Sequence, residues 1–305
     1  MFEFLAWLFP TDCPIEQKEV EWLVKRLNWL MGQFGSDDFT KRQPVAPEGD
    51  FSARAFDRSP RDMRRLFSCL CRHLKLDERY VDFQLYEGEK RARAEFDLFT
   101  GAISYQSSST PGLYRDGYDQ KVLIDRGLGR DFDGLIATLA HELAHVKLHR
   151  ESDIQPDWED YEKLTDLAAV FFGFGIFQAR TAERDFRPDY DGYEVPTNRM
   201  GYLPTAVICH ALAMSAWIQK DLKPGWIGHL DWRTRRNFKR SIRYMRGDRN
   251  CVLGMDAAGA LVLQKASAQP VGLEEKLRQA IEREDYGEAA RLKKLIEQDG
   301  SKKQG

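Results

Sequence analysis

The sequence predicts an α+β fold in which a small sheet is followed by a mostly helical second half. Strands are indicated by short segments with alternating apolar and polar residues and many aromatic or β-branched side chains: 80–86, 92–98 and 102–105. Residues 112–114 lead into a further expected strand at 121–125. From residue 131 onward, apolar residues instead recur at helical spacing. Strands and helices segregated along the chain are typical of an α+β domain.

Two helices are expected before the strands. Residues 16–34 have amphipathic spacing and end at Gly35, and loops rich in proline and aspartate follow to about residue 60. Ser59-Pro60 is a helix-start signal, so a second helix is expected over 60–74. The apolar first ten residues contain Glu3 and have neither a basic region nor a small-residue cleavage site, so we do not expect a signal peptide.

The most informative motif is His141-Glu142-Leu143-Ala144-His145, within an expected helix that Asp131 or Asp133 can cap. The apolar residues of this segment that recur at helical spacing are Leu135, Ile136, Leu139, Leu143 and Val146. Histidines four residues apart lie on one helix face, so both imidazoles can bind one metal ion. Glu142 between them can take a proton from a metal-bound water. We interpret His141 and His145 as metal ligands and Glu142 as a general base.

A catalytic zinc ion usually has three protein ligands and one position for water. Glu162 is the candidate third ligand, although it also fits an acidic surface stretch. Asp166, one turn later, could accept a hydrogen bond from a zinc-bound histidine. Asp160 and Asp166 remain alternative ligands. His149, one turn after the motif, could lie on the substrate side.

Peptide hydrolysis at such a site also needs a hydrogen-bond donor for the developing oxyanion. Four residues are possible donors: Tyr161, Tyr193, Tyr202 and His210. The sequence does not choose among them.

Two apolar segments, 167–177 and 206–218, are too short to span a bilayer and are bounded by polar residues. We expect both to be buried helices packed behind the metal site. Gly173 and Gly175 would let the first of them approach a neighbouring helix closely.

Residues 231–250 are rich in arginine, with eight basic side chains: Arg233, Arg235, Arg236, Lys239, Arg240, Arg243, Arg246 and Arg249. One interpretation is a helix with a solvated basic face and with Phe238, Ile242 and Met245 packed inward. The other is a surface that binds phosphate or nucleic acid.

Residues 256–271 are rich in Gly, Ala, Ser and Pro and are expected to form a linker, and 299–305 a disordered tail. Between them, 272–298 predicts two short helices, with Asp285 and Glu288 able to form a capping box. The segment resembles the UVR motif of UvrB and UvrC in Leu273-Glu274, Ala280-Ile281, Glu284-Asp285-Tyr286 and Ala289-Ala290-Arg291-Leu292. Gly287 and Lys293-Lys294 depart from that motif. The resemblance implies a helical hairpin that binds a protein partner or a second copy.

The net charge of −2 gives no reason to expect a polyelectrolyte role for the whole chain. Its five cysteines are odd in number and form no C-x-x-C pair. This favours a reducing, cytoplasmic setting and argues against a disulfide framework.

H-E-x-x-H followed by Glu162-x-x-x-Asp166 resembles the gluzincin class of zinc metallopeptidases. The resemblance implies a zincin-like domain over 1–255, with one zinc ion per chain held by His141, His145 and Glu162. Asp166 would orient the first histidine. In such domains an edge strand pairs with extended substrate, and 121–125 is the candidate here.

Residues 12–250 also resemble a group of bacterial zinc-dependent proteins of unknown substrate. The matching motifs are Cys13-Pro14-Ile15, Trp29-Leu30, Phe34-Gly35, Leu164-Thr165-Asp166, Phe172-Gly173-Phe174-Gly175, Gly201-Tyr202-Leu203 and Ala211-Leu212-Ala213. His-Glu-Leu-Ala-His with His149 is similar to the ImmA/IrrE-type metallopeptidases.

These observations predict a cytoplasmic zinc metallopeptidase that hydrolyses a peptide or protein, with a hairpin at 272–298 for partner binding. The alternative is a non-catalytic zinc-binding adaptor or regulator that acts through the hairpin. A third hypothesis is a DNA-damage-linked factor that uses Arg233–Arg249. No membrane partner is expected.

Overall fold

The computed structural model describes 13–86, 94–96, 103–105, 112–115, 120–154, 158–182, 201–246 and 252–264. It also describes Leu277, Ala280, Ile281, 287–288 and 290–293. By its internal contacts the chain divides into two units, Met1–Gln264 and Lys265–Gly305, and each is described by itself.

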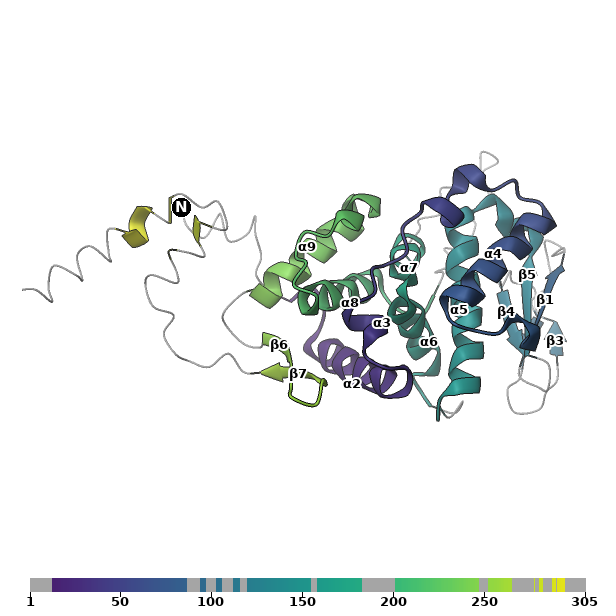
Figure 1. Cartoon of the computed structure of the whole chain (residues 1–305), viewed down its shortest axis with the longest axis horizontal. Helices are drawn as coiled ribbons and strands as arrows, with labels where there is room; N and C mark the ends of the chain where they lie inside the picture. Colours follow the sequence, from purple (N-terminus) through teal and green to yellow (C-terminus); the bar gives the residue numbers. More distant parts are fainter. Residues whose placement is uncertain are drawn as a thin grey trace, which may run out of the picture. The chain divides into compact units, whose positions relative to one another are not determined.

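Helices form most of the first unit (Figure 1). They are α2 (Gln17–Phe34), α3 (Asp37–Thr40), α4 (Pro60–His73), α5 (Phe132–Glu151), α6 (Tyr161–Ala169), α7 (Gly175–Thr181), α8 (Thr205–Ile218) and α9 (Trp232–Arg246). A small sheet accompanies them, so the expected mixture of helices with few strands is confirmed. No helix in the described part of the chain is long and apolar enough to cross a membrane.

The main sheet has three strands in the order β1 (Val81–Tyr86), β5 (Gln120–Asp125) and β4 (Gly112–Arg115). β1 pairs parallel to β5, and β4 pairs antiparallel to β5. Segment 121–125 is therefore the central strand, and the expectation that it is a free edge was wrong. Alternation along a strand reports one buried face, but it does not report whether neighbours lie on both sides. β2 (Ala94–Phe96) and β3 (Ile103–Tyr105) form a separate antiparallel pair.

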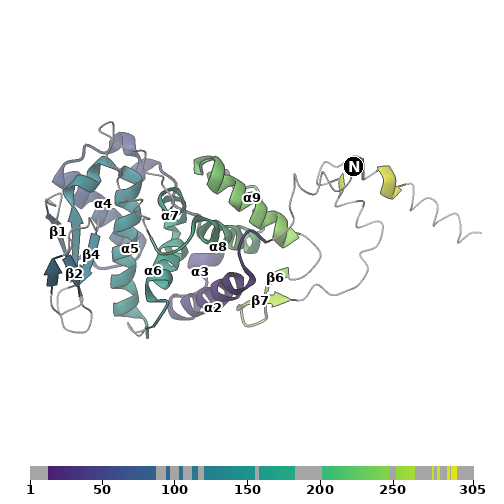
Figure 2. The same ribbon diagram turned by 180° about the vertical axis from the view of Figure 1, so that it is seen from behind.

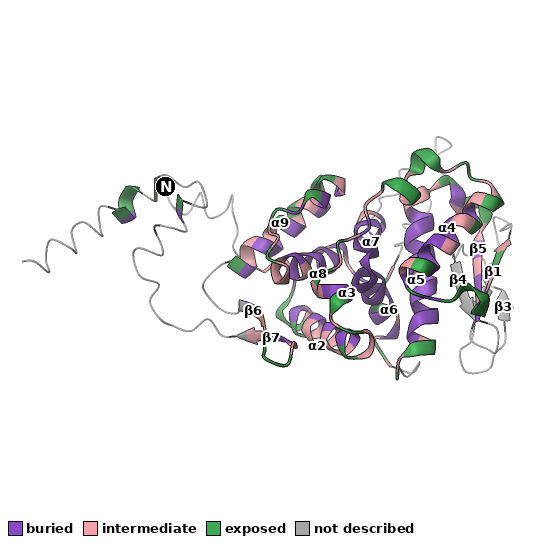
Figure 3. Cartoon of the chain, viewed as in Figure 1, coloured by how far each residue is buried: buried purple, intermediate pink, exposed green. Residues whose placement is uncertain are grey.

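Helix α5 lies at the centre of the first unit, between the main sheet and helices α6 and α7 in both views (Figures 1 and 2). It begins where Oδ1 of Asp131 accepts a hydrogen bond from the backbone N–H of Gly134 (3.1 Å), so Asp131 is the capping residue. Asp133 instead pairs with Arg180 of α7 (2.8 Å). Most residues of α5 are buried (Figure 3), which holds the histidine motif on a rigid element.

The apolar segment expected to be one helix over 167–177 is divided. Helix α6 and helix α7 are joined by a π-helical turn, Val170–Phe174, that kinks at Gly173 (φ +103°). At Gly175 a Cβ atom would lie 2.7 Å from Cδ2 of Leu212 in α8. The close approach expected of this glycine is therefore present.

Because of this contact, we expect alanine substitution at two helical glycines to change the free energy of unfolding in opposite directions. Gly175→Ala should lower the free energy of unfolding by about 1–3 kcal/mol, because the buried side chains of Leu212 and Val170 have to move. Gly32→Ala should raise it by about 0.5–1 kcal/mol, because Gly32 is exposed within α2 and no atom lies within 4 Å of its Cβ position. Urea unfolding of both variants checks this, and equal effects would contradict it.

The first part of the expected linker at 256–271, residues 256–264, is ordered in a β-hairpin. Strands β6 (Val252–Met255) and β7 (Leu261–Gln264) form an antiparallel hairpin whose Leu253 and Leu261 are buried. The side chain of Asn28 in α2 bonds both backbone groups of Leu261, at 2.8 Å and 2.7 Å. Two buried leucines in a Gly- and Ala-rich stretch are too weak a signal to show this hairpin in advance.

In the second unit, the described residues of the expected hairpin are helical. Ala280 and Leu292 are buried against each other, with Leu277 packed on them, whereas Ile281 is 53% exposed. The tail at 299–305 lies outside the described residues.

Candidate metal centre

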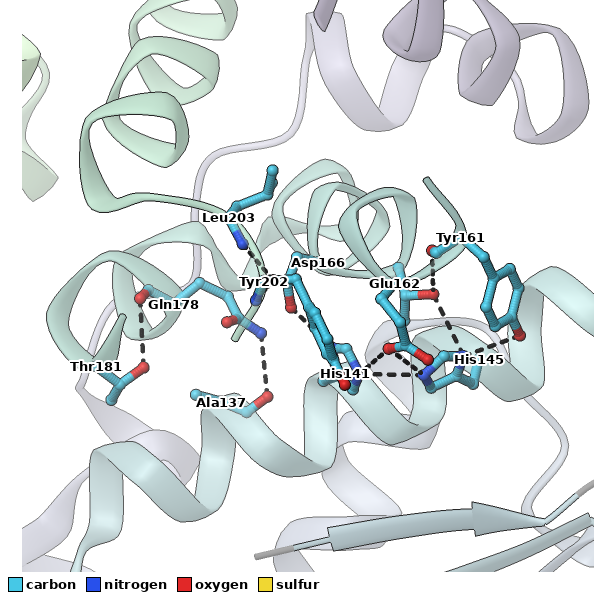
Figure 4. Close-up of polar contacts among 11 residues, drawn as sticks. Ala137, His141, His145, Tyr161, Glu162, Asp166, Gln178, Thr181, Tyr202 and Leu203 are labelled. Carbon is cyan, nitrogen blue, oxygen red and sulfur yellow. Dashed lines mark hydrogen bonds and ion pairs between the residues drawn. The ribbon is translucent and has the colours of Figure 1, made fainter. Parts of the chain in front are cut away.

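Three side chains from two neighbouring helices form a group that can hold a metal ion (Figure 4). His141 and His145 come from α5, and Glu162 comes from the first turn of α6. The two Nε2 atoms lie 3.0 Å apart, and Oε2 of Glu162 lies 3.3 Å from that of His141 and 3.4 Å from that of His145. The sequence predicted this trio, and the fold brings its ligand atoms within 4.8 Å of one another.

Asp166 orients His141. Nδ1 of His141 donates to Oδ1 of Asp166 (2.7 Å), so its Nε2 atom faces the ligand group. The other oxygen of Asp166 accepts from the backbone N–H groups of Tyr202 (2.5 Å) and Leu203 (2.9 Å). These contacts hold the carboxylate, which is 1% exposed, in one position.

His145 is oriented by two hydroxyl groups. Its Nδ1 lies 2.9 Å from the phenol oxygen of Tyr161 and 3.3 Å from Oγ1 of Thr165. Thr165 donates to the backbone carbonyl of Tyr161 (3.0 Å), so its lone pairs face the imidazole. Tyr161 was considered as an oxyanion donor, but here its hydroxyl contacts a ligand histidine. Thr165 was not anticipated, since a buried threonine at helical spacing resembles any core residue.

Burial and charge set the protonation of the two histidines in opposite directions. Burial lowers the pKa of His141, but hydrogen bonds to Asp166 and Glu162 outweigh it and hold the pKa well above its ordinary value. Burial lowers the pKa of His145 to about 4, and Glu162 offsets only part of this. His145 is therefore neutral at pH 7, as a metal ligand must be.

The two carboxyl groups also differ. Burial raises the pKa of Glu142 to about 7, helped by the negative charges of Glu162 and Asp166. Although burial opposes it, hydrogen bonds to both histidines hold the pKa of Glu162 far below its usual range. Glu162 is therefore anionic, as a carboxylate metal ligand would be, and Glu142 can both accept and donate a proton near neutral pH.

Two tyrosines lie close to this group. The ring of Tyr202 stacks on His141 at 6.0 Å between centroids, and Tyr202 is 53% exposed. Partial burial, followed by the nearby carboxylates, raises the pKa of Tyr202 to about 12, so its hydroxyl stays protonated and can donate. Tyr86 ends β1 and pairs in register with Asp125. Burial raises the pKa of Tyr86, and the charges of Asp125 and Glu142 add to the shift.

Other sequence candidates lie elsewhere. Asp160 is bound by Arg26 (2.5 Å) and by the indole of Trp22 (2.6 Å), so it anchors α2 and is not a ligand. His210 lies buried between α8 and α9, 3.1 Å from Oγ of Ser241, and burial lowers its pKa to about 4. No described contact links His210 to the ligand group.

His149 packs its ring on Tyr161 at 5.7 Å between centroids, one turn beyond His145. It is not one of the three residues whose ligand atoms converge. Tyr193 lies outside the described residues.

The donor set fits a zinc ion. Zinc binds imidazole nitrogen and carboxylate oxygen, and catalytic sites offer three such ligands with one open position. Here both Nδ1 atoms are already hydrogen-bonded, so both Nε2 lone pairs point to the same place. The side chain of Glu162 is 36% exposed, so the site has a side open to water.

Metal binding is expected to release a proton. The raised pKa of His141 keeps its metal-free imidazole protonated at pH 7, and a metal must displace that proton. Affinity should therefore rise as pH increases and weaken as pH falls, by up to about tenfold per pH unit below that pKa. Calorimetric titration with zinc in two buffers of different ionisation enthalpy measures the released protons, and identical heats would contradict this.

Gly201 allows the backbone to approach Asp166. It has φ +99°, and a Cβ there would lie 3.1 Å from Oδ2 of Asp166. Gly201→Ala should weaken metal binding about 10–100-fold, because the carboxylate that orients His141 would shift. Gly259→Ala is the matched control, since Gly259 also has positive φ (+81°) but only Cε of Met255 near its Cβ position, at 3.9 Å. Equal zinc affinity of the two variants would contradict the assignment.

Comparison of the chain with protein-family models, with curated proteins and with solved structures found no match.

Proposed function

We propose that this chain is a zinc-dependent peptidase that hydrolyses peptide bonds in a peptide or protein substrate. The observation that carries the proposal is the convergence of His141, His145 and Glu162 beside a buried glutamate, Glu142, whose pKa is near 7. A purely structural zinc site is normally closed by four protein ligands, whereas this group has three among the described residues.

Each residue of the site then has a distinct task. A bound zinc ion would supply an acidified water and polarise the scissile carbonyl. Glu142 takes the proton of the attacking water and passes it to the leaving amine. The Tyr202 hydroxyl is the candidate donor to the oxyanion, because it stays protonated and the ring that carries it stacks on His141. Asp166 stabilises the orientation of His141 throughout.

The proposal is tested with the purified full chain. We expect one zinc ion per chain by elemental analysis, and cleavage products from a mixed peptide library by mass spectrometry. A chelator should abolish cleavage, and added zinc should restore it. One bound zinc with no product from any peptide would contradict the peptidase proposal.

The second candidate is a zinc-binding adaptor, favoured by the helical residues near the C-terminus. Leu277, Ala280 and Leu292 cluster, but Ile281 is left exposed, and so small a core suggests docking on a partner. Deleting 272–298 should then remove a co-purifying partner while zinc binding persists. Under the peptidase proposal, cleavage of short peptides should survive this deletion.

A further inference from the structure

A second, basic cavity lies between α7, α8 and α9. It has a volume of about 310 Å³, at the lower end of the range for small-molecule sites. Its walls include Arg180, Thr205, Trp232, Arg233, Arg236 and Arg240. None of the described metal-centre residues lines it, so it is a separate feature of the molecule.

Arginines outnumber carboxylates among the described residues that line this cavity. Four arginines line it, and one of them, Arg180, also pairs with Asp133 at 2.8 Å. The one lining carboxylate, Asp231, accepts at Oδ1 from the backbone N–H and the hydroxyl of Thr234, both at 2.9 Å. Arg236 is exposed and makes no hydrogen bond or ion pair with the described residues. Nε of Arg240 is buried and likewise lacks a hydrogen-bond partner in the described part of the chain. These guanidinium groups leave donors available for an anion.

A buried hydroxyl borders the same cavity. Thr205 is 4% exposed, and its Oγ1 has no hydrogen-bond partner among the residues that the structure describes. A buried hydroxyl without a partner is costly, and a ligand oxygen would satisfy it. Thr205 begins α8, whose N-terminus has no side-chain cap, so this long helix directs its positive end toward the region. The N-terminus of α9 is already capped by Asp231.

We propose that this cavity binds a small molecule that carries a phosphate group. Arginine forks, helix N-termini and a hydroxyl are the groups that proteins use to bind phosphate oxygens. Trp232 is 68% exposed with the Arg233 guanidinium 5.3 Å from its ring centre, so it offers a flat surface for an organic portion. A concave cavity favours a small ligand over nucleic acid, which would contact a row of phosphates along an open face.

The test uses the full chain, with inorganic phosphate, adenosine monophosphate and a short oligodeoxythymidylate as probes in low salt. We expect phosphate and the nucleotide to raise the melting temperature and to bind in calorimetric titrations. Arg236→Gln should weaken both by about tenfold. Lys239→Gln is the matched control, because Lys239 is an exposed cation of the same helix that does not line the cavity.

Thr205→Val provides a second, uncharged test. It should leave the ligand-free melting temperature unchanged or raised, since it removes an unpartnered hydroxyl, and it should weaken phosphate binding about fivefold. Equal losses in Arg236→Gln and Lys239→Gln, or tight oligonucleotide binding without binding of either small probe, would overturn the proposal. So would the absence of any binding at low salt.

Discussion

Glu142→Gln is expected to lower peptide hydrolysis by about 10²–10⁴-fold while one zinc ion per chain is retained. The amide has nearly the shape of the carboxyl group but cannot take a proton from water. Glu142 is not one of the three converging ligands, so the metal group should stay intact. The measurement is kcat on a cleaved peptide together with zinc content.

The variant should also fold normally. In the metal-free protein, burial raises the pKa of Glu142 to about 7. Ionisation of Glu142 therefore destabilises the folded state increasingly as the pH rises from the pKa of Glu142 in the unfolded chain toward about 7. Glutamine removes that destabilisation, and unfolding at pH 8 should show no loss of stability. Glu159→Gln is the matched control, since Glu159 is an exposed carboxylate close in sequence to the third ligand. Full activity in Glu142→Gln would rule out the assigned base.

His145→Ala is expected to weaken zinc binding by about 10²–10³-fold. The reason is that each protein ligand contributes roughly 3–4 kcal/mol to the binding free energy at a zinc site. His145 is buried, neutral and held by Tyr161 and Thr165, so its Nε2 is already placed for a metal. Competition with a chelator of known affinity measures the change.

His149→Ala is the matched comparison, one turn further along the same helix. Its ring contacts Tyr161 but does not join the ligand group, so zinc affinity should change little. Equal losses in the two variants would contradict the assigned ligand set. A fall in kcat/KM with zinc retained would instead place His149 on the substrate side.

Much of the secondary structure could be predicted from local patterns of apolar and polar residues. The strands and most helices could be predicted because their residues alternate or recur at helical spacing, and Phe238, Ile242 and Met245 of the arginine-rich helix are buried as that spacing indicates. The order of the strands could not be predicted, since β5 has the same alternation whether it is central or at an edge. The β6–β7 hairpin was missed because it is held by contacts to distant elements, through Asn28 of α2 and Trp217 of α8.

For the site, sequence alone determined the residues of one helix face. The spacing of His141 and His145 places both imidazoles on the same side of α5, whatever the surrounding fold. Only the tertiary structure decided which carboxylate completes the group, because Glu162, Asp160 and Asp166 are close in sequence but face different neighbours. Asp160 meets Arg26 and Trp22, Asp166 meets His141, and Glu162 alone meets both histidines. Those contacts depend on how α6 packs against α5 and α2, and no local pattern of residues specifies that packing.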